Sequence, residues 1–425
     1  MAIDGKRVVL MICDGHRNDF VRPDLCPAIC DVTAEGRRFL NHRAIFPSAT
    51  RASAASIATG WWPATHGLHG NMMGFDEGDG PIVHDVGKPE FVETMRRVTG
   101  KTLEVPTLAE RLKDHGGAVI MSNVSPGAAY FHDPDSHGHV YHRAASFGPG
   151  RVELPPEEAR PVTPDAAGDM ALTDRFCTEV LMDRAPTLGV LWLCDPDKSM
   201  HADVLGSETH LQGIRDADAC VARVSRSVTD LRAKGEEVLF VLGSDHGQES
   251  VAHAIPVATL MVGAGLKEAH NSTDVAIAPQ GAGAHLYLAE RAQSRLPAIR
   301  DWLAAQPWCG QIFAGDELRA IGHRPGGSHA MSFAMRHQDL PNAHGVMGLI
   351  DICTSEEKPG KPAGHGSHGG MGAYETRPFL TISGGGFAPG TVEHGTSRLI
   401  DIAPTILRHL GLPRDGVDGL ALPQS

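Results

Sequence analysis

Residues 238–247 read VLFVLGSDHG, an apolar run that ends in an acid and an imidazole. A continuous apolar run is typical of a strand in a parallel sheet, because helices cover both faces of such a sheet. Similar runs, each ending in polar residues or glycines, recur at residues 7–13, 118–121, 189–194 and 379–383. Helix-like stretches separate the runs, at residues 106–115, 210–234 and 397–410. This alternation predicts an α/β fold, with a central mostly parallel sheet between helices.

Long segments interrupt this alternation. Residues 66–117 and 123–188 are rich in His, Pro and Gly, and we expect them to be insertions in the core. Residues 255–360 contain a strand-like run, HLYLAE, and a helix-like run, SRLPAIRDWLAAQ. We therefore predict a core made of residues 1–254 and 361–425, and a smaller α+β cap insertion at residues 255–360.

Composition excludes several classes of partner. The chain has 425 residues, and its 38 basic and 51 acidic residues give a net charge of −13 with His neutral. We expect no nucleic-acid or membrane partner, since nonspecific binding to either needs a basic surface. No apolar run approaches the roughly 18 residues of a membrane span, and the N-terminal stretch lacks the apolar segment of a secretory signal. The eight scattered cysteines favour reduced thiols and a cytoplasmic protein.

Chemically reactive side chains gather where the predicted strands end. Three acids and two histidines follow the apolar runs: Asp14, Asp197, His201, Asp245 and His246. The carboxyl ends of parallel strands meet at one edge of a sheet, so we expect these side chains to converge. In a helix, the spacing Asp197-x-x-x-His201 places both groups on one face. Such ligands suit zinc, or less selectively manganese or iron, and without cations the carboxylates would repel one another.

A hydroxyl follows a proline-containing loop in residues 46–60, FPSATRASAASIATG. The alanine-rich body of this stretch predicts a helix that ends at Gly60, and Thr50 falls near its start. Backbone amides and the helix dipole favour an anion there, so the Thr50 hydroxyl could lose its proton to a metal and attack phosphorus. The alternative is that Thr50 only caps the helix, which is a common role for Ser and Thr.

Taken in order along the chain, these residues resemble the alkaline phosphatase superfamily. The matching set is Asp14, Thr50, Asp197-x-x-x-His201, Asp245-His246-Gly247 and His368-Gly369. Further matches are Thr59-Gly60, Pro63, His66-Gly67, Gly70-Asn71 and Asp401-Ile402-Ala403-Pro404-Thr405. The sequence is most similar to the branch that holds the nucleotide pyrophosphatases/phosphodiesterases and phosphonoacetate hydrolase. The resemblance covers residues 7 to about 75, 189–250 and 364–420, and it implies an alkaline-phosphatase-like core.

This resemblance implies a metal-binding catalytic core with two divalent ions, zinc being expected and manganese or iron being alternatives. One ion is expected at Asp197, His201 and His368. The second is expected at Asp14, Asp245, His246 and the Thr50 oxygen. Thr50 is the expected nucleophile, and Asn71 is expected to hydrogen-bond a phosphoryl oxygen. Two ions roughly 4 Å apart stabilise both the attacking and the leaving oxygen of an in-line displacement.

The implied activity is that of a metal-dependent phosphohydrolase acting on a small phosphorylated or phosphonate substrate. It would cleave phosphodiester or pyrophosphate bonds through a phospho-threonine intermediate. Residues 50–54 read TRASA, which excludes the Cys-x-Pro-x-Arg sequence of the sulfatase branch. Residues 121–127 read MSNVSPG and lack the lysine motif with which phosphonoacetate hydrolase grips a carboxylate. Arg51 is then a candidate substrate contact, or else a solvated side chain on the first helical turn.

Other functions are left open. They are hydrolysis of a C–P bond in a phosphonoacetate-like substrate, phosphomonoesterase activity, and binding of a phosphorylated ligand by a metal-loaded protein without catalysis. The presence of Thr50 with all six metal-ligand side chains argues against the last of these. The oligomeric state is also left open, with a homodimer as one candidate.

Several histidines have no assigned role. One group suits a third metal site, a substrate contact or a polar loop: His132, His137, His139 and His142. His365 competes with His368 as a metal ligand, and the His-Gly pattern of the family favours His368. A last group falls in the predicted cap and includes candidates for the substrate entrance: His323, His329, His337 and His344.

Overall fold

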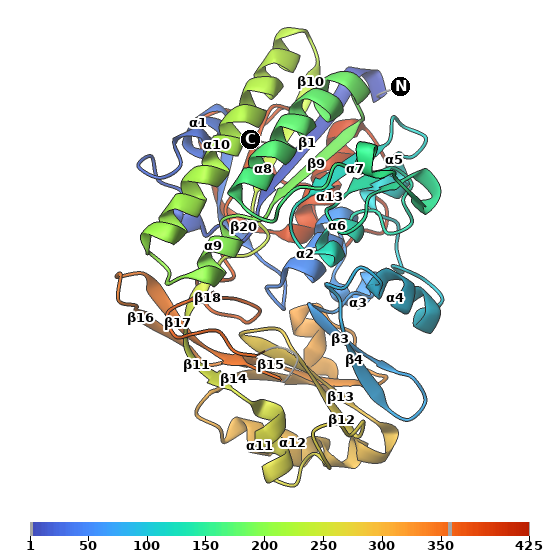
Figure 1. The fold of residues 1–425 in the computed structure, drawn as a ribbon, viewed down its shortest axis with the longest axis vertical. Helices are drawn as coiled ribbons and strands as arrows, with labels where there is room; N and C mark the ends of the chain where they lie inside the picture. The colour runs from blue at the N-terminus through green and yellow to red at the C-terminus, as the bar shows by residue number, and fades with distance from the viewer. Residues whose placement is uncertain (1–2, 356–358, 425) are drawn as a thin grey trace.

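The computed structural model describes residues 3–355 and 359–424. Figure 1 shows two lobes, with a large sheet and its helices in the upper lobe and smaller sheets in the lower one. The large sheet has ten strands in the order β20-β2-β19-β10-β1-β9-β5-β6-β7-β8. No helix in the described ranges is long and apolar enough to cross a membrane.

Strand β1 (Lys6–Cys13) lies inside this sheet, between two parallel neighbours. These are β10 (Glu237–Gly243) on one side and β9 (Leu188–Leu193) on the other. β9 pairs in parallel with β5 (Ala118–Ser122), which pairs in parallel with β6 (His139–Tyr141). The expected α/β fold with a mostly parallel sheet is therefore confirmed.

Alternate side chains of β1 enter two different hydrophobic cores. One core contains Val8, Leu10 and Ile12, together with side chains of α2 (Thr50–Thr59) and α13 (Ile402–Leu410). The other contains Val9, Met11 and Cys13, together with side chains of α1 (Pro27–Glu35), α8 (Ala166–Arg175) and α10 (Glu208–Ala233). Helices thus cover both faces of the sheet, which is why the strand reads as one continuous apolar run.

Strand β19 (Leu380–Ser383) departs from the parallel pattern. It pairs antiparallel with β10 and with β2 (Arg37–Arg43), and β2 pairs in parallel with β20 (Thr391–Arg398). The opposite edge is also antiparallel, through β7 (Phe147–Gly148) and β8 (Val152–Glu153). Burial on both faces gives β19 the same apolar composition as its parallel neighbours, so composition does not reveal its direction.

The lower lobe contains two four-stranded sheets. One has the order β16-β17-β11-β18, with bounds His337–Pro341, Met347–Cys353, Glu249–Ile255 and Gly366–Ser367. The other has the order β12-β13-β15-β14, with bounds Val275–Pro279, Gly283–Leu288, His329–Met335 and Cys309–Ala314. Helices α11 (Val257–Gly263) and α12 (Leu296–Ala304) share a core with the second sheet.

Shorter elements join these layers. The hairpin of β3 (Met72–Asp76) and β4 (Pro81–Asp85) contacts β12, so an early part of the chain packs against the lower lobe. The remaining α-helices are α3 (Pro63–His66), α4 (Phe91–Thr99), α5 (Leu108–Leu112), α6 (Pro126–Tyr130), α7 (Pro156–Ala159) and α9 (Asp197–Ala202). A π-helical segment, Phe176–Arg184, continues α8.

The central position of β1 predicts a large stability cost for truncating its side chains. Leu10 is fully buried, whereas Leu420 is 75% exposed. We expect Leu10→Ala to lower the free energy of unfolding by about 2–5 kcal/mol, because it leaves a cavity in the core. Leu420→Ala, the control, is expected to change it by about 0.5 kcal/mol or less. Equal effects of the two changes in urea unfolding would contradict this assignment of the core.

Candidate metal centre and active site

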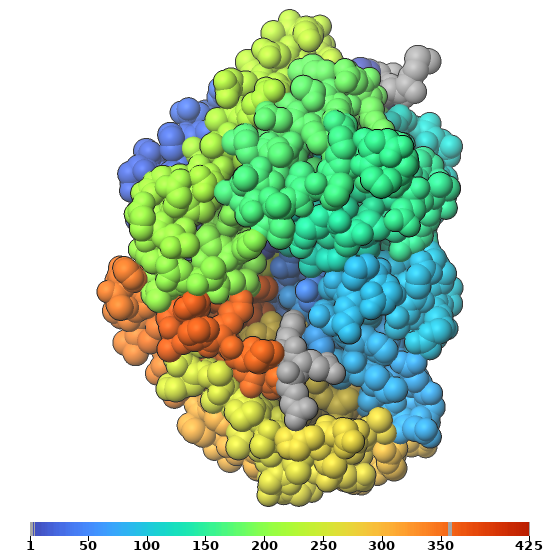
Figure 2. All heavy atoms as spheres, in the orientation of Figure 1, coloured from blue at the N-terminus to red at the C-terminus, as the bar shows by residue number. Residues whose placement is uncertain are grey.

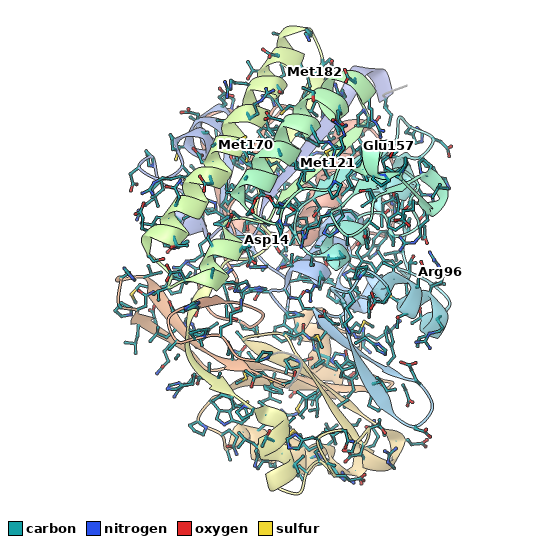
Figure 3. All side chains as sticks on the ribbon, in the orientation of Figure 1. Asp14, Arg96, Met121, Glu157, Met170 and Met182 are labelled. Atoms are coloured by element: carbon teal, nitrogen blue, oxygen red, sulfur yellow. The ribbon has the colours of Figure 1, made fainter. Side chains whose placement is uncertain are left out.

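Three adjacent strands place acids at one edge of the large sheet. Asp14 directly follows β1, Asp197 begins α9 just after β9, and Asp245 lies two residues beyond β10. Figure 3 labels Asp14, which lies toward the lower lobe at the end of the upper sheet. The predicted convergence of the strand ends is therefore present in the fold.

The candidate ligands form two groups. Ligand atoms of Asp14, Asp245 and His246 all lie within 4.8 Å of one another, and these side chains are fully buried. The second group consists of Asp197, His201 and His368, whose ligand atoms also lie within 4.8 Å of one another. The rings of His246 and His368 stack with their centroids 3.7 Å apart, so the two groups adjoin. All six expected ligand side chains therefore lie in one place.

Backbone carbonyls orient the three imidazoles. Nδ1 of His246 lies 2.9 Å from the Gly247 carbonyl oxygen. Nδ1 of His201 lies 2.7 Å from the Gly366 carbonyl oxygen, and Nδ1 of His368 lies 2.6 Å from that of Ser48. A carbonyl only accepts hydrogen bonds, so each Nδ1 carries the proton and each Nε2 is left with its lone pair. This is the usual arrangement of histidines that bind a metal.

Those Nε2 atoms face carboxylate oxygens. His246 Nε2 lies 3.2 Å from Asp245 Oδ2 and 3.5 Å from Asp14 Oδ1, and His201 Nε2 lies 3.4 Å from Asp197 Oδ1. Burial lowers the pKa of His246, so its imidazole is neutral. An imidazole lone pair and an ionised carboxylate repel each other at these distances, and a cation bound between them would turn this repulsion into attraction.

In the two ligand groups, Asp14 Oδ1 and Asp245 Oδ2 are buried carboxylate oxygens without a hydrogen-bond partner among the described residues. Their partner oxygens are bound, since Trp192 Nε1 donates to Asp14 Oδ2 at 2.8 Å and the Gly15 amide donates to Asp245 Oδ1 at 3.2 Å. Burial, and then the charge of Asp245, raise the pKa of Asp14 well above its usual range. Burial likewise raises the pKa of Asp245 to about 8. The donor set fits a divalent cation, which would neutralise these carboxylates.

Thr50 is the first residue of α2, and Ala49 occupies the N-cap position. Thr50 is therefore not the capping residue, and its Oγ1 lies 3.0 Å from His246 Nε2. The hydroxyl therefore points at the metal-ligand group while it stays beside the first-turn amides of the helix. Gly60 ends α2 in the left-handed conformation, as expected for a glycine C-cap.

Asn71 and Arg51 lie next to Thr50 and are joined to each other by hydrogen bonds. The Arg51 amide donates to Asn71 Oδ1 at 3.1 Å. The Arg51 guanidinium donates to Ser125 Oγ, to the Asn71 carbonyl and to Asp85 Oδ1, at 3.0–3.1 Å. Arg51 is thus not a solvated side chain, and it fixes the position of Asn71.

A cavity of about 560 Å³ opens in front of these groups. Figure 2 shows a hollow on this face of the molecule, between the green segments of the core and the yellow and orange segments of the lower lobe. Thr50, Asn71 and His368 line the cavity. So do three cations that sequence reasoning missed: Arg143, Lys198 and Lys361. They come from three separate segments, so no local motif connects them, although Lys198 does follow Asp197 directly.

The other histidines named from the sequence lie elsewhere. His365 Nδ1 lies 3.1 Å from the His201 carbonyl oxygen, and His365 joins neither ligand group. None of the metal-competent groups in the described ranges includes His132, His137, His139 or His142. His337 pairs with Glu249 at 2.5 Å, and His344 is exposed. His323 and His329 meet His69 in a third group, which the sequence did not indicate.

Comparisons of the fold identify similar solved structures. Murine ectonucleotide pyrophosphatase/phosphodiesterase 5, in an inactive form with AMP, matches with a TM-score of 0.67 at 16% identity, over 99% of this chain and 97% of that one. Phosphonoacetate hydrolase from Sinorhizobium meliloti 1021, in complex with phosphonoformate, matches with a TM-score of 0.67 at 15% identity, over 96% and 95% of the two chains. At these identities the structures establish a shared fold.

Comparisons of the sequence identify the family. No curated protein matches the chain. The sequence model of the type I phosphodiesterases and nucleotide pyrophosphatases matches residues 8–307, which include the Thr50 helix and five of the six candidate metal ligands. With the fold and the site in agreement, the chain belongs to the type I phosphodiesterase/nucleotide pyrophosphatase family, within the alkaline phosphatase superfamily.

Proposed function

We propose that this phosphoester hydrolase cleaves phosphodiester or pyrophosphate bonds of a small molecule through a phospho-threonine intermediate and depends on two divalent metal ions. One observation carries the proposal. The Thr50 hydroxyl lies 3.0 Å from His246 Nε2, inside a set of ligands in which Asp14 Oδ1 and Asp245 Oδ2 have no hydrogen-bond partner among the described residues. A capping threonine has no reason to lie there.

The two ligand groups would each hold one ion, most suitably Zn²⁺ because the set mixes imidazoles and carboxylates. Asp197, His201 and His368 would hold the first ion. Asp14, Asp245, His246 and the Thr50 oxygen would hold the second. When bound, the ions would neutralise the buried carboxylates and favour the alkoxide form of the Thr50 hydroxyl.

The side chains of the protein supply position and charge for the displacement at phosphorus. Thr50 Oγ1 forms a bond to phosphorus while the bond between phosphorus and the leaving oxygen breaks. First-turn amides of α2 favour the negative charge on the incoming group. The Arg51 backbone amide donates a hydrogen bond to Asn71 Oδ1. The side-chain nitrogen of Asn71 therefore faces away from this bond and can donate to a phosphoryl oxygen. Water then breaks the phospho-threonine bond and regenerates Thr50.

The cavity favours an anionic substrate of small size. Positive charge beside the ligand groups comes from four side chains that line the cavity: Arg51, Arg143, Lys198 and Lys361. A second phosphate or another anionic substituent of the substrate would meet these cations. We also propose that residues 255–360 act as the substrate-selective cap over the core of residues 1–254 and 361–425, and that the protein is cytoplasmic, since its eight cysteines are all free.

Hydrolysis of a C–P bond is the second candidate. The sequence lacks a lysine in residues 121–127, but Lys198 and Lys361 reach the same cavity from other segments. Either could bind a substrate carboxylate, as in a phosphonoacetate-like molecule.

Replacing Thr50 tests the nucleophile. We expect Thr50→Ala to remove turnover by on the order of a thousandfold or more, because the attacking oxygen is gone. Its stability should fall by about 1 kcal/mol or less, since Thr50 does not cap α2. Thr50→Ser should retain measurable activity. The matched control is Ser53→Ala, which removes another buried hydroxyl of the same helix; full activity in folded, metal-loaded Thr50→Ala would refute the mechanism.

Elemental analysis of protein purified without chelator tests the metal groups. We expect Asp197→Asn and Asp245→Asn each to lower the metal content by about one ion per chain relative to the wild type. The control is Asp218→Asn, a buried carboxylate that accepts the Ala28 and Ile29 amides and belongs to no ligand group in the described ranges. Unchanged metal content in both site variants, or activity that survives chelation, would contradict the proposal.

A substrate panel separates the remaining functions. We expect the zinc-loaded protein to hydrolyse bis-p-nitrophenyl phosphate with a higher kcat/KM than p-nitrophenyl phosphate or phosphonoacetate. A preference for p-nitrophenyl phosphate would indicate a phosphomonoesterase, and release of phosphate from phosphonoacetate would indicate the C–P bond hydrolase. Binding of AMP without turnover of any compound would indicate a metal-bound phospho-ligand-binding protein.

A further inference from the structure

Three histidines from distant parts of the chain meet outside the candidate active site. His69 lies between α3 and β3, His323 follows a short 3-10 helix, and His329 begins β15. Their ring centroids form a nearly equal triangle, with sides of 5.1, 5.4 and 5.5 Å. One ligand nitrogen of each ring lies within 4.8 Å of the others. His69 comes from the core segment, whereas His323 and His329 come from the lower lobe.

The hydrogen bonds of His323 define which nitrogen is protonated. Its Nε2 lies 2.9 Å from the carbonyl oxygen of Phe46, and a carbonyl only accepts, so Nε2 carries the proton. The lone pair is therefore on Nδ1. This atom is buried and has no hydrogen-bond partner within the described ranges. An orphaned imidazole lone pair in a protein interior is costly unless something binds it.

A chain of hydrogen bonds defines the protonation of His329 in the same way. His285 Nε2 donates to the His69 carbonyl at 3.0 Å, so His285 Nδ1 must accept, and the Ser332 hydroxyl donates to it at 2.8 Å. Ser332 Oγ then accepts from His329 Nε2 at 3.0 Å. The lone pair of His329 is left on Nδ1, which is again buried without a partner among the described residues.

His69 is the most accessible member of the triangle. It is half-buried, and its Nδ1 lies 3.4 Å from the Tyr287 hydroxyl, at the long end of hydrogen-bond distances. His69, His329 and Tyr287 line a cavity of about 220 Å³, which provides an entry path and room for a water ligand. Burial lowers the pKa of His69 to about 3 and that of His323 to about 4, so the rings are neutral.

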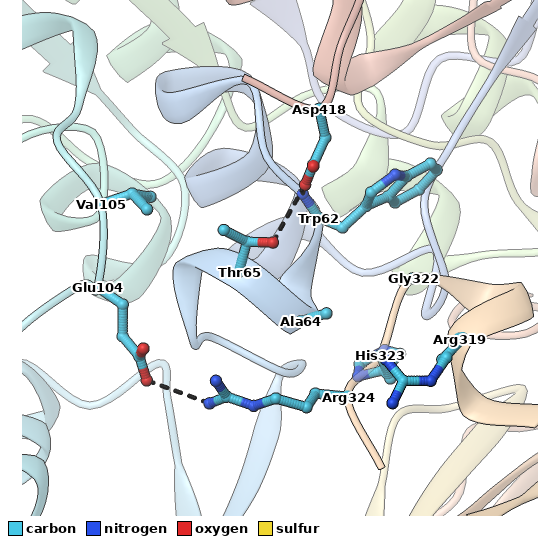
Figure 4. A pocket seen from close by; sticks show the side chains of 10 residues that line it. All are labelled: Trp62, Ala64, Thr65, Glu104, Val105, Arg319, Gly322, His323, Arg324 and Asp418. Carbon is cyan, nitrogen blue, oxygen red and sulfur yellow. Dashed lines mark hydrogen bonds and ion pairs between the residues drawn. The ribbon is translucent and has the colours of Figure 1, made fainter. Parts of the chain in front are cut away.

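The nearby charges are balanced. Arg324 follows His323 at the edge of a second cavity, and its guanidinium pairs with Glu104 at 3.3 Å (Figure 4). Glu104 therefore offsets the charge of Arg324, which would otherwise oppose a metal ion beside His69.

We propose that His69, His323 and His329 form a third metal site, which takes Zn²⁺ or a similar borderline divalent ion with water as the fourth ligand. Neutral imidazoles with the second nitrogen bonded to a carbonyl or hydroxyl are the ligands that zinc prefers. Zn–N bonds of about 2.1 Å place tetrahedral ligand nitrogens roughly 3.4 Å apart. Because the ligand nitrogens already lie within 4.8 Å of one another, binding would draw them together by no more than this difference.

Such an ion would restrict the movement of the loop that precedes Thr50. His323 donates to the Phe46 carbonyl, and Phe46 lies four residues before Thr50. His69 lies two residues before Asn71, which is bonded to Arg51. The ion would therefore join the lower lobe to both segments that place the proposed reacting groups.

Metal titration of the full-length chain tests this site apart from the active site. In a His201→Ala/His246→Ala background, which removes one ligand from each catalytic group, we expect chelator-stripped protein to bind one equivalent of Zn²⁺. Co²⁺ in its place should give the intense visible absorption of a four-coordinate ion. Adding His329→Gln should weaken Zn²⁺ binding by at least about tenfold. Adding His69→Gln, at a half-buried position, provides the same comparison where His329→Gln disturbs folding.

The matched control is His42→Gln. His42 is also buried and also has an unpartnered ring nitrogen within the described ranges, but it belongs to no metal-competent group there. We expect it to leave Zn²⁺ binding in the same background unchanged. The site is disproved if the background protein binds no Zn²⁺, or if His69→Gln binds Zn²⁺ as tightly as the background does.

Discussion

The burial of carboxyl groups with too few hydrogen-bond partners, at the carboxyl edge of the central sheet, is the constraint on which the rest of the site depends. Asp14 and Asp245 follow adjacent parallel strands and are fully buried, each with one oxygen that no described residue binds. Leaving a charge in such a place costs several kcal/mol. His246 and His368 do not relieve the cost, because backbone carbonyls hold their Nδ1 protons and burial keeps the rings neutral. The fold thus builds a site that a cation would complete.

The connections between the two lobes pass through the same site. The chain leaves the core just after His246, along β11, and returns along β18 just before His368. The loop before Thr50 accepts a hydrogen bond from a metal-ligand candidate and another from the lower lobe. His368 donates to the Ser48 carbonyl, and His323 donates to the Phe46 carbonyl. A displacement of the lower lobe would therefore move ligands and nucleophile together. Through these hydrogen bonds, a change in the lower lobe would alter the position of Thr50 relative to the ligand groups of the core.

Particular residues show how far prediction from the sequence reached. The apolar runs at residues 7–13, 189–194 and 238–243 were predicted as central parallel strands, and they are. The run at residues 379–383 has the same composition but is antiparallel, because the direction of a strand depends on its connections. Thr50 was compatible with a cap or a nucleophile, and the tertiary structure favours the second role, because Ala49 occupies the N-cap position and Thr50 Oγ1 lies 3.0 Å from His246 Nε2. Arg143, Lys198 and Lys361 share a cavity without sharing a motif.

The sequence by itself determined the α/β class, the strand ends that carry the acids, and the family to which the ordered motifs belong. It could do so because burial on both faces imposes continuous apolar runs and because catalytic groups keep their order along a chain. Only the tertiary structure decided which imidazole nitrogens carry lone pairs, which cations face the substrate cavity, and that His69, His323 and His329 meet. These features depend on contacts between residues far apart in the sequence, and such contacts leave no local periodicity or spacing to read.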